Sequence, residues 1–231
     1  MSEAVATSES ARGRFFRGRL VGAAAIAFAA SVVIQNAVHV GAPTFDAPIE
    51  EVLAYYGANR GRVAISVAQV GLNLPLLLVF VTGLHCLVER RGGAGADWSR
   101  LALAAGAALS AIFALTTVLE IGVALSASGL AEPTPAFELV WQLHAAAFAL
   151  ALPALGTTFV GAALASDASR LTPAWQRLLG LVGGSLLLAA GVGNLAIAGG
   201  SALLFVGLAG FAAWLVWLLA TGLRLVRSDI D

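Results

Sequence analysis

The sequence predicts an all-α protein whose helices cross a membrane several times. Of its 231 residues, 59% are hydrophobic and only 11% are charged, and the mean hydropathy is +0.90. An ordinary soluble domain is about 25% charged, because a surface in water needs polar side chains. These values exclude a soluble domain and predict a bundle of helices surrounded by lipid.

Six stretches are long enough to cross the membrane, because a helix needs about 20 mostly apolar residues to span ~30 Å of hydrocarbon. The expected spans are residues 19–40, 62–88, 101–126, 138–165, 175–198 and 201–226. Together they form one transmembrane domain, residues 19–226. A basic segment, residues 1–18, precedes this domain, and a short tail, residues 227–231, follows it.

The arginines determine the expected orientation. Eleven of the 13 basic residues fall on one side of this arrangement of spans, and only Arg60 and Arg62 fall on the other. Basic residues accumulate in cytoplasmic loops, so we expect both termini in the cytoplasm. The chain contains no Lys and much Ala and Gly, which is typical of GC-rich bacterial genomes, so the expected location is a bacterial inner membrane.

The loops of the opposite side are expected at residues 41–61, 129–137 and 198–200. In the first of them, residues 46–57 carry Ile49, Val52, Leu53 and Tyr56 at helical spacing. This pattern predicts a short interfacial helix that lies on the outer membrane surface.

Composition and motifs exclude several classes of function. The 13 basic and 13 acidic residues balance, which gives no argument for a nucleic-acid partner. A single cysteine, Cys86, excludes a disulfide within the chain and a cysteine-based zinc or iron–sulfur site. The sequence has no nucleophile elbow, phosphate-binding loop or dinucleotide-binding fingerprint, so it gives no indication of an enzyme.

Polar side chains gather in the outer half of the expected bundle, on five different spans. Gln35 and His39, like Thr116 and Glu120, are four residues apart and so share a helix face. Polar groups are costly against lipid, and these faces are therefore expected to turn inward. The candidate polar pocket consists of Gln35, Asn36, His39, Gln69, Asn73, Thr116, Thr117, Glu120, Gln142, His144 and Asn194.

Three interpretations of this polar layer stay open. It is a pocket that binds, senses or transports a small ligand or ion, or it belongs to a structural or accessory subunit in which polar groups only hold helices together. The third is a b-type haem protein with His39 and His144 as axial ligands. These histidines and Glu120 also match the ligand number of a metal site, but without a motif, so we expect neither metal nor haem.

Glu120 is the most informative residue of the layer. Ionisable side chains within a membrane are costly and by default functional. We therefore expect Glu120 to be buried and to have a polar partner in the layer. An oligomer or partner subunit is compatible with the sequence, because small-residue pairs such as Gly18 with Gly22 and Gly180 with Gly184 allow close contacts between helices.

Pro75 and Pro153 predict kinks in the second and fourth spans. Both lie in Leu-rich segments of helices that run in the same direction, a similarity that fits either an internal repeat or coincidence. A proline removes a helical hydrogen bond, and the freed carbonyl is costly against lipid, so both kinks are expected to face the bundle interior. Trp214 and Trp217 are expected in an interfacial belt or against lipid.

The overall layout is also informative. A basic N-terminus and a long first outer loop are followed by Trp141-Gln142-Leu143-His144, by Leu152-Pro153 and by Trp175-Gln176-Arg177. Over nearly its whole length the chain thereby resembles a broad group of small bacterial six-pass membrane proteins known only as domains of unknown function. The resemblance implies six helices, and it implies no activity, cofactor or catalytic residue.

Overall fold

The computed structural model describes residues 18–227, and this part of the chain forms eight helices and no strand. The basic segment up to residue 17, with Arg12, Arg14 and Arg17, and residues 228–231 lie outside the described residues. Six of the eight helices are long and apolar enough to cross a membrane, which confirms the predicted all-α fold. They are α2 (Gly18–Val38), α4 (Arg60–Arg90), α5 (Ala96–Ala127), α6 (Pro135–Ala168), α7 (Ala174–Val192) and α9 (Leu203–Arg227).

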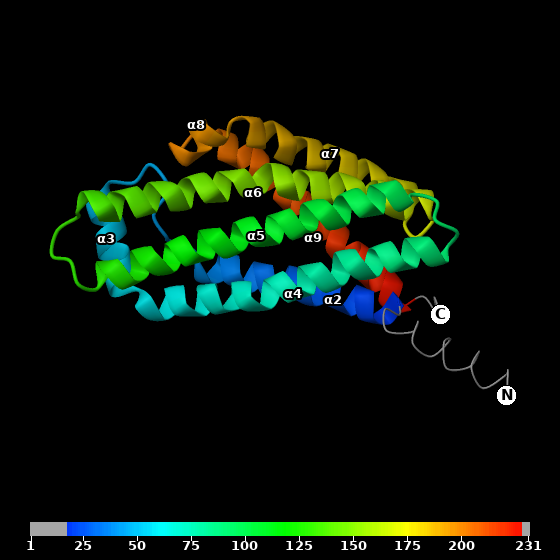
Figure 1. The fold of residues 1–231 in the computed structure, drawn as a ribbon, viewed down its shortest axis with the longest axis horizontal. Coiled ribbons are helices and arrows are strands. Elements are labelled where there is room, and N and C mark those ends of the chain that lie inside the picture. Colours follow the sequence, from blue (N-terminus) through cyan, green and yellow to red (C-terminus); the bar gives the residue numbers. More distant parts are fainter. Residues whose placement is uncertain (1–17, 228–231) are drawn as a thin grey trace.

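The six long helices form a closed ring. Each helix packs against the next in the order α2, α4, α5, α6, α7, α9, and α9 returns to α2. In Figure 1 the helices follow the long axis of the molecule, and the C-terminal end of α9 lies near the N-terminal end of α2. We call this end of the ring the terminal end, and the opposite end, which carries helix α3 (Ile49–Ala58), the α3 end.

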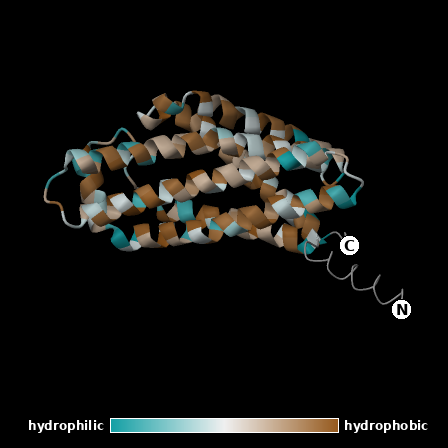
Figure 2. Ribbon diagram, in the orientation of Figure 1, coloured by the Kyte–Doolittle hydropathy of each residue, from teal (hydrophilic) through white to brown (hydrophobic). Residues whose placement is uncertain are grey.

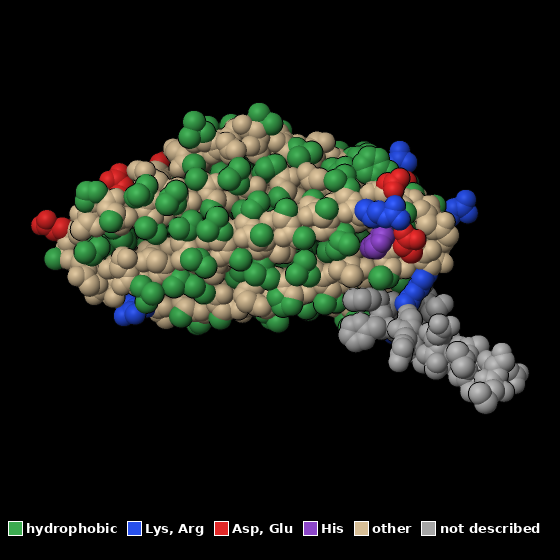
Figure 3. Space-filling model, viewed as in Figure 1, with side chains coloured by type: hydrophobic (Ala, Val, Ile, Leu, Met, Phe, Trp, Pro, Cys, Tyr) green, Lys and Arg blue, Asp and Glu red, His purple; other side chains and the backbone are tan. Residues whose placement is uncertain are grey.

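The outside of the ring is apolar between two polar ends. Brown, apolar residues follow the long helices in Figure 2, and charged side chains lie at the two ends of the face shown in Figure 3. Large apolar side chains point outward, among them Val192, which is 89% exposed. A continuous apolar surface of this kind suits lipid and not water. The chain is therefore a multi-pass membrane protein.

Two short helices complete the α3 end, namely α3 and α8 (Asn194–Ala198). Helix α3 confirms the short helix expected in the first loop, and Figure 1 shows it running across the ends of the long helices. Its position on the membrane surface stays a prediction. The helix packs inward, because Val52 and Tyr56 are buried in an apolar cluster with Val123 and Trp141. The expected fifth span is divided: α7 ends at Val192, and α8 follows as a separate turn.

Glycines allow neighbouring helices to touch. A Cβ atom added to Gly22 of α2 would lie 2.6 Å from the backbone oxygen of Gly222 on α9. Gly180 of α7 packs in the same way against Ala163 of α6. The small residues noted in the sequence thus make close contacts between helices of one chain.

Trp214 and Trp217 of α9 fill the centre of the ring. Both side chains are 0% exposed, and their rings stack with centroids 5.5 Å apart. The rings of Phe80 on α4 and Phe159 on α6 pack edge-on against this pair. The prediction that the two tryptophans lie in a belt or against lipid is wrong, because the middle of a six-helix ring needs large side chains to fill it. We call these four aromatic residues the aromatic floor.

The two prolines lie within continuous helices, in different surroundings. Pro75 is on the exposed side of α4, because α4 turns the opposite face, with Asn73 and Leu77, toward the ring interior. The expectation that both prolines face the interior is therefore wrong for Pro75. Pro153 packs against Gly191 of α7, where an added Cβ atom would lie 2.6 Å from the proline Cδ atom. An internal repeat stays a prediction.

Candidate functional site

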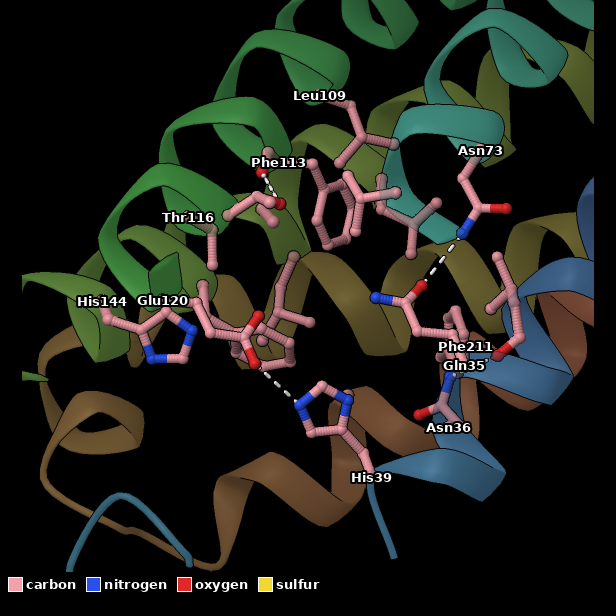
Figure 4. A pocket seen from close by; sticks show the side chains of 18 of the residues that line it. Gln35, Asn36, His39, Asn73, Leu109, Phe113, Thr116, Glu120, His144 and Phe211 are labelled. Carbon is pink, nitrogen blue, oxygen red and sulfur yellow. Dashed lines mark hydrogen bonds and ion pairs between the residues drawn. The ribbon is translucent and has the colours of Figure 1, made fainter. Parts of the chain in front are cut away.

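A cavity of about 270 Å³ lies inside the ring, between the α3 end and the aromatic floor. Its walls come from α2, the first loop, α3, α4, α5, α6 and α9. The lining includes eight of the predicted polar residues: Gln35, Asn36, His39, Asn73, Thr116, Thr117, Glu120 and His144. Toward the floor the lining becomes apolar, with Leu77, Leu109 and Leu155 around Trp214. Figure 4 shows side chains from opposite sides of the ring converging on this space.

Glu120 is the one charged residue set deep in a long helix within the described part of the chain. All other charged residues of these helices lie within four residues of a helix end. Glu120 is only 5% exposed, and its Oε1 atom accepts a hydrogen bond from Nε2 of His39 at 2.9 Å. Nδ1 of His39 lies 2.7 Å from the hydroxyl of Ser66. A chain of hydrogen bonds thus joins α5, the end of α2 and α4.

These contacts fit a neutral tautomer of His39 with its hydrogen on Nε2. Ser66 then donates to Nδ1, and Nε2–H donates to Glu120, so that each donor has an acceptor. A protonated His39 would donate from both nitrogens, with the Ser66 hydroxyl as acceptor at Nδ1 and Glu120 as its ion-pair partner. In both forms of His39, Nε2–H donates to the Glu120 carboxylate.

A serine, a histidine and a carboxylate in one chain also occur in hydrolases, where the serine is the nucleophile. Ser66 does not fit that role, because it is 1% exposed and is not part of the cavity lining. A substrate in the cavity does not reach its hydroxyl. Ser66 is a positioning residue that fixes the orientation of the His39 ring.

Part of the predicted polar layer holds α2 against α4. The hydroxyl of Ser31 donates to the Gln69 side chain, and Nδ2 of Asn73 donates to Oε1 of Gln35 at 2.9 Å. At the end of α2, the guanidinium of Arg62 donates to two backbone carbonyls at 2.8 and 2.9 Å. Gln69 lies outside the cavity lining, and its role is structural.

Two other predicted residues do not reach the cavity. Gln142 is exposed and donates to Glu138 on its own helix at 3.2 Å. It lies two residues before His144, so it points to the opposite side of α6. Asn194 begins α8, half-buried and outside the lining. Thr116 and Thr117 do line the cavity, but each hydroxyl donates to a carbonyl four residues earlier in α5.

The aromatic residues that line one side of the cavity are not among the predicted pocket residues. Trp141 stacks on the ring of His144, with centroids 5.2 Å apart. The ring of Phe45, from the first loop, lies 5.8 Å from Trp141, and the ring of Tyr56 lies 6.0 Å from it. Trp141 precedes His144 by one helical turn, a spacing that indicates a shared face. That spacing is the sequence signal for this group.

Tyr56 of α3 lines the cavity together with Glu120. Burial raises the pKa of the Tyr56 phenol, and the nearby Glu120 and Tyr55 side chains raise it further. The phenol therefore keeps its proton at neutral pH.

Four buried polar atoms of the lining residues have no hydrogen-bond partner in the described part of the chain. They are Oδ1 of Asn73, Nε1 of Trp141, Nδ1 of His144 and Nε1 of Trp214. Buried polar atoms are normally paired, because an unpaired one has lost its water without compensation. These atoms are unpaired polar groups within the walls of the cavity.

The haem and metal alternatives gain no support from these residues. Both ring nitrogens of His39 already take part in hydrogen bonds, and Figure 4 shows Glu120 between His39 and His144. Across the described residues, no group of three or more His, Cys, Asp or Glu side chains is arranged to hold a metal ion.

Comparison of the chain with protein-family models, curated proteins and solved structures finds no significant match. The resemblance to six-pass proteins of unknown function therefore stays a prediction.

Proposed function

We propose that the chain is a bacterial inner-membrane protein that binds a small amphiphilic molecule in its cavity. The observation that carries this proposal is the division of the lining. Glu120, His39 and His144 lie at the α3 end, and aliphatic and aromatic side chains surround the deeper part. A molecule with a polar head and an apolar body would match both parts, as ligands generally match the few polar groups of an apolar pocket.

The aromatic floor favours binding over transport. Trp214 lines the bottom of the cavity, and Trp217, stacked beneath it, is not part of the lining. Both are completely buried. A path through the ring to the terminal end would require these rings to move apart. The cavity is therefore a closed-ended site, as in a sensor or a binding subunit.

The opening of the cavity lies between α2 and α9. Among the lining residues only Asn36 of α2 and Leu208 of α9 are classed as exposed. The two helices touch at the terminal end, where Gly22 meets Gly222, and the cavity lies between them toward the α3 end. This opening faces the lipid of one leaflet, which provides amphiphiles with a route of entry.

Charge supports an outward-facing α3 end. Within the described residues this end carries five acidic and two basic side chains, and the terminal end carries three acidic and eight basic side chains. Arg91 reaches the backbone carbonyl of Arg170 in a neighbouring loop, so two of the basic loops touch. Basic loops stay in the cytoplasm.

Reporter fusions test this orientation. A periplasm-only reporter fused after Gly129, in the loop between α5 and α6, is expected to be active, because that loop is at the α3 end. The same reporter fused after Gly93, between α4 and α5, is expected to be inactive. The reverse pattern would show that the cavity opens to the cytoplasmic leaflet.

Filling the cavity tests the binding site. Ala151 of α6 is buried and lines the cavity, so Ala151→Leu is expected to abolish saturable binding of eight-carbon amphiphiles without lowering stability. Ala146→Leu, on the exposed side of the same helix, is the matched control and is expected to bind normally. Binding is measured by equilibrium dialysis of radiolabelled 1-octanol, octylamine and octanoate against the protein in nanodiscs, with empty nanodiscs as blank. If none of the three binds the unaltered protein saturably, the polar layer is structural and the proposal is wrong.

A further inference from the structure

We infer that the amphiphile bound in the cavity carries a cationic head, a protonated or quaternary amine on an apolar body. The inference rests on the proposed binding function and specifies the chemical class of the ligand. Three independent features of the described residues support it: the charge of the lining, its aromatic content and the charge of the surrounding surface.

The charge of the lining excludes an anionic head. Glu120 is its carboxylate, and the lining contains no Arg or Lys. A phosphate, sulfate or carboxylate head would be buried beside Glu120 without a permanent positive partner, which is strongly unfavourable in an apolar site. A cation gains a charge-assisted interaction with the same group.

The surroundings of Glu120 are consistent with a positively charged ligand head. His39, which Ser66 orients, contacts Glu120, and the phenol of Tyr56, which also lines the cavity, keeps its proton. Oε1 accepts from His39, and the carboxylate retains further acceptor sites for an ammonium group. The ring of His144 also lines the cavity, and its Nδ1 atom has no partner among the described residues.

The lining is rich in aromatic rings. Eight of its 29 residues are Phe, Tyr or Trp, whereas these types make up 8% of the chain. Phe45, Tyr56, Trp141 and Phe148 form a contiguous group at the polar end, with ring centroids 5.3–6.0 Å apart. The electron-rich face of an aromatic ring attracts a cation within about 6 Å, and desolvation strengthens this attraction.

The surface around the cavity is negatively charged, like the lining. The α3 end carries Asp46, Glu50, Glu51, Glu132 and Glu138 against two arginines among the described residues. Arg62 is engaged with the carbonyls at the end of α2. A net negative surface raises the local concentration of cations and lowers that of anions.

Three probes with the same eight-carbon tail test the sign of the head. Octylammonium, 1-octanol and octanoate are titrated at pH 7 into the protein in phosphatidylcholine nanodiscs, which carry no net lipid charge. Octylammonium is expected to bind one molecule per chain at least tenfold more tightly than octanol, and octanoate is expected to show no saturable binding. Octyltrimethylammonium is expected to compete with octylammonium, because the ring faces and the carboxylate recognise charge without an N–H group.

Glu120→Gln is the decisive variant, because it keeps the shape of the side chain and removes its charge. It is expected to reduce octylammonium affinity tenfold or more and to leave octanol affinity unchanged. Glu138→Gln, an exposed carboxylate at the same end, is the matched control and is expected to keep the preference for the cation. Trp141→Leu provides a second variant if Glu120→Gln does not fold, and a severalfold loss for octylammonium alone is expected.

The outcomes separate this inference from the proposed function. Equal affinity for octanol and octylammonium, or an unchanged preference in both Glu120→Gln and Trp141→Leu, overturns the cationic head and leaves the amphiphile site standing. If octanoate binds more tightly than octylammonium, the inference of a cationic head is also overturned. Absence of saturable binding by every probe overturns both proposals.

Discussion

Trp217→Ala is expected to lower the free energy of unfolding by about 3–5 kcal/mol. Trp217 is completely buried and stacks on Trp214, with Phe80 and Phe159 edge-on against the pair. Truncation leaves a cavity where α9 meets α4 and α6, and the surrounding helices cannot close it without losing their own contacts. Titration with sodium dodecyl sulfate in mixed micelles, followed by circular dichroism, measures the change.

Trp175→Ala is the matched control. Trp175 lies at the start of α7 and is 53% exposed, so its removal is expected to change the free energy of unfolding by less than about 1 kcal/mol. Similar losses for both variants would mean that the aromatic floor is not a special centre of packing. A large loss in the free energy of unfolding for Trp217→Ala alone would support the closed ring of helices as the stable unit.

Gly22→Ala is expected to cost about 1–3 kcal/mol through overpacking. The added methyl group would lie 2.6 Å from the backbone oxygen of Gly222 and 2.9 Å from Cβ of Leu225. A backbone oxygen cannot rotate away, so α2 and α9 must separate at the point where the ring closes. The same detergent titration measures the loss, and intact binding at the α3 end would show that the separation stays local.

Gly71→Ala provides the comparison for that substitution. A Cβ atom on Gly71 meets no atom within 4 Å, because this side of α4 is exposed. Alanine is also the better helix former, so unchanged or slightly higher stability is expected. A loss as large as that of Gly22→Ala would indicate that helix contact is not the cause.

The spans were predictable because length and hydropathy alone determine them. The uncertain points were the helix ends: α6 begins at Pro135, three residues before the expected start, and α7 ends at Val192 instead of near residue 198. Gly193 lies against Leu203, a contact that no local pattern reveals. Trp214 and Trp217 were assigned to lipid because hydropathy does not show which helices form the ring.

The candidate site was predictable only in part, for a similar reason. The spacing of Gln35 with His39 and of Thr116 with Glu120 indicated inward faces, and these four residues line one cavity. Ser66, which orients His39, looked like any small residue of an apolar helix. Its importance depends on α2 lying beside α4, an arrangement that exists only in three dimensions.

The hydrogen-bonded pairs of the polar layer also have a consequence for biosynthesis. His39, which binds Glu120, precedes it in the chain, and so does Ser66, which orients His39. When α5 enters the membrane during translation, these groups have already been synthesised. Glu120 can therefore be paired before α6, α7 and α9 arrive, and the later helices contribute mainly apolar walls. Helix α9 is made last and closes the ring. Because Glu120 can be paired before that step, the nascent protein does not depend on α9 to shelter the buried carboxylate.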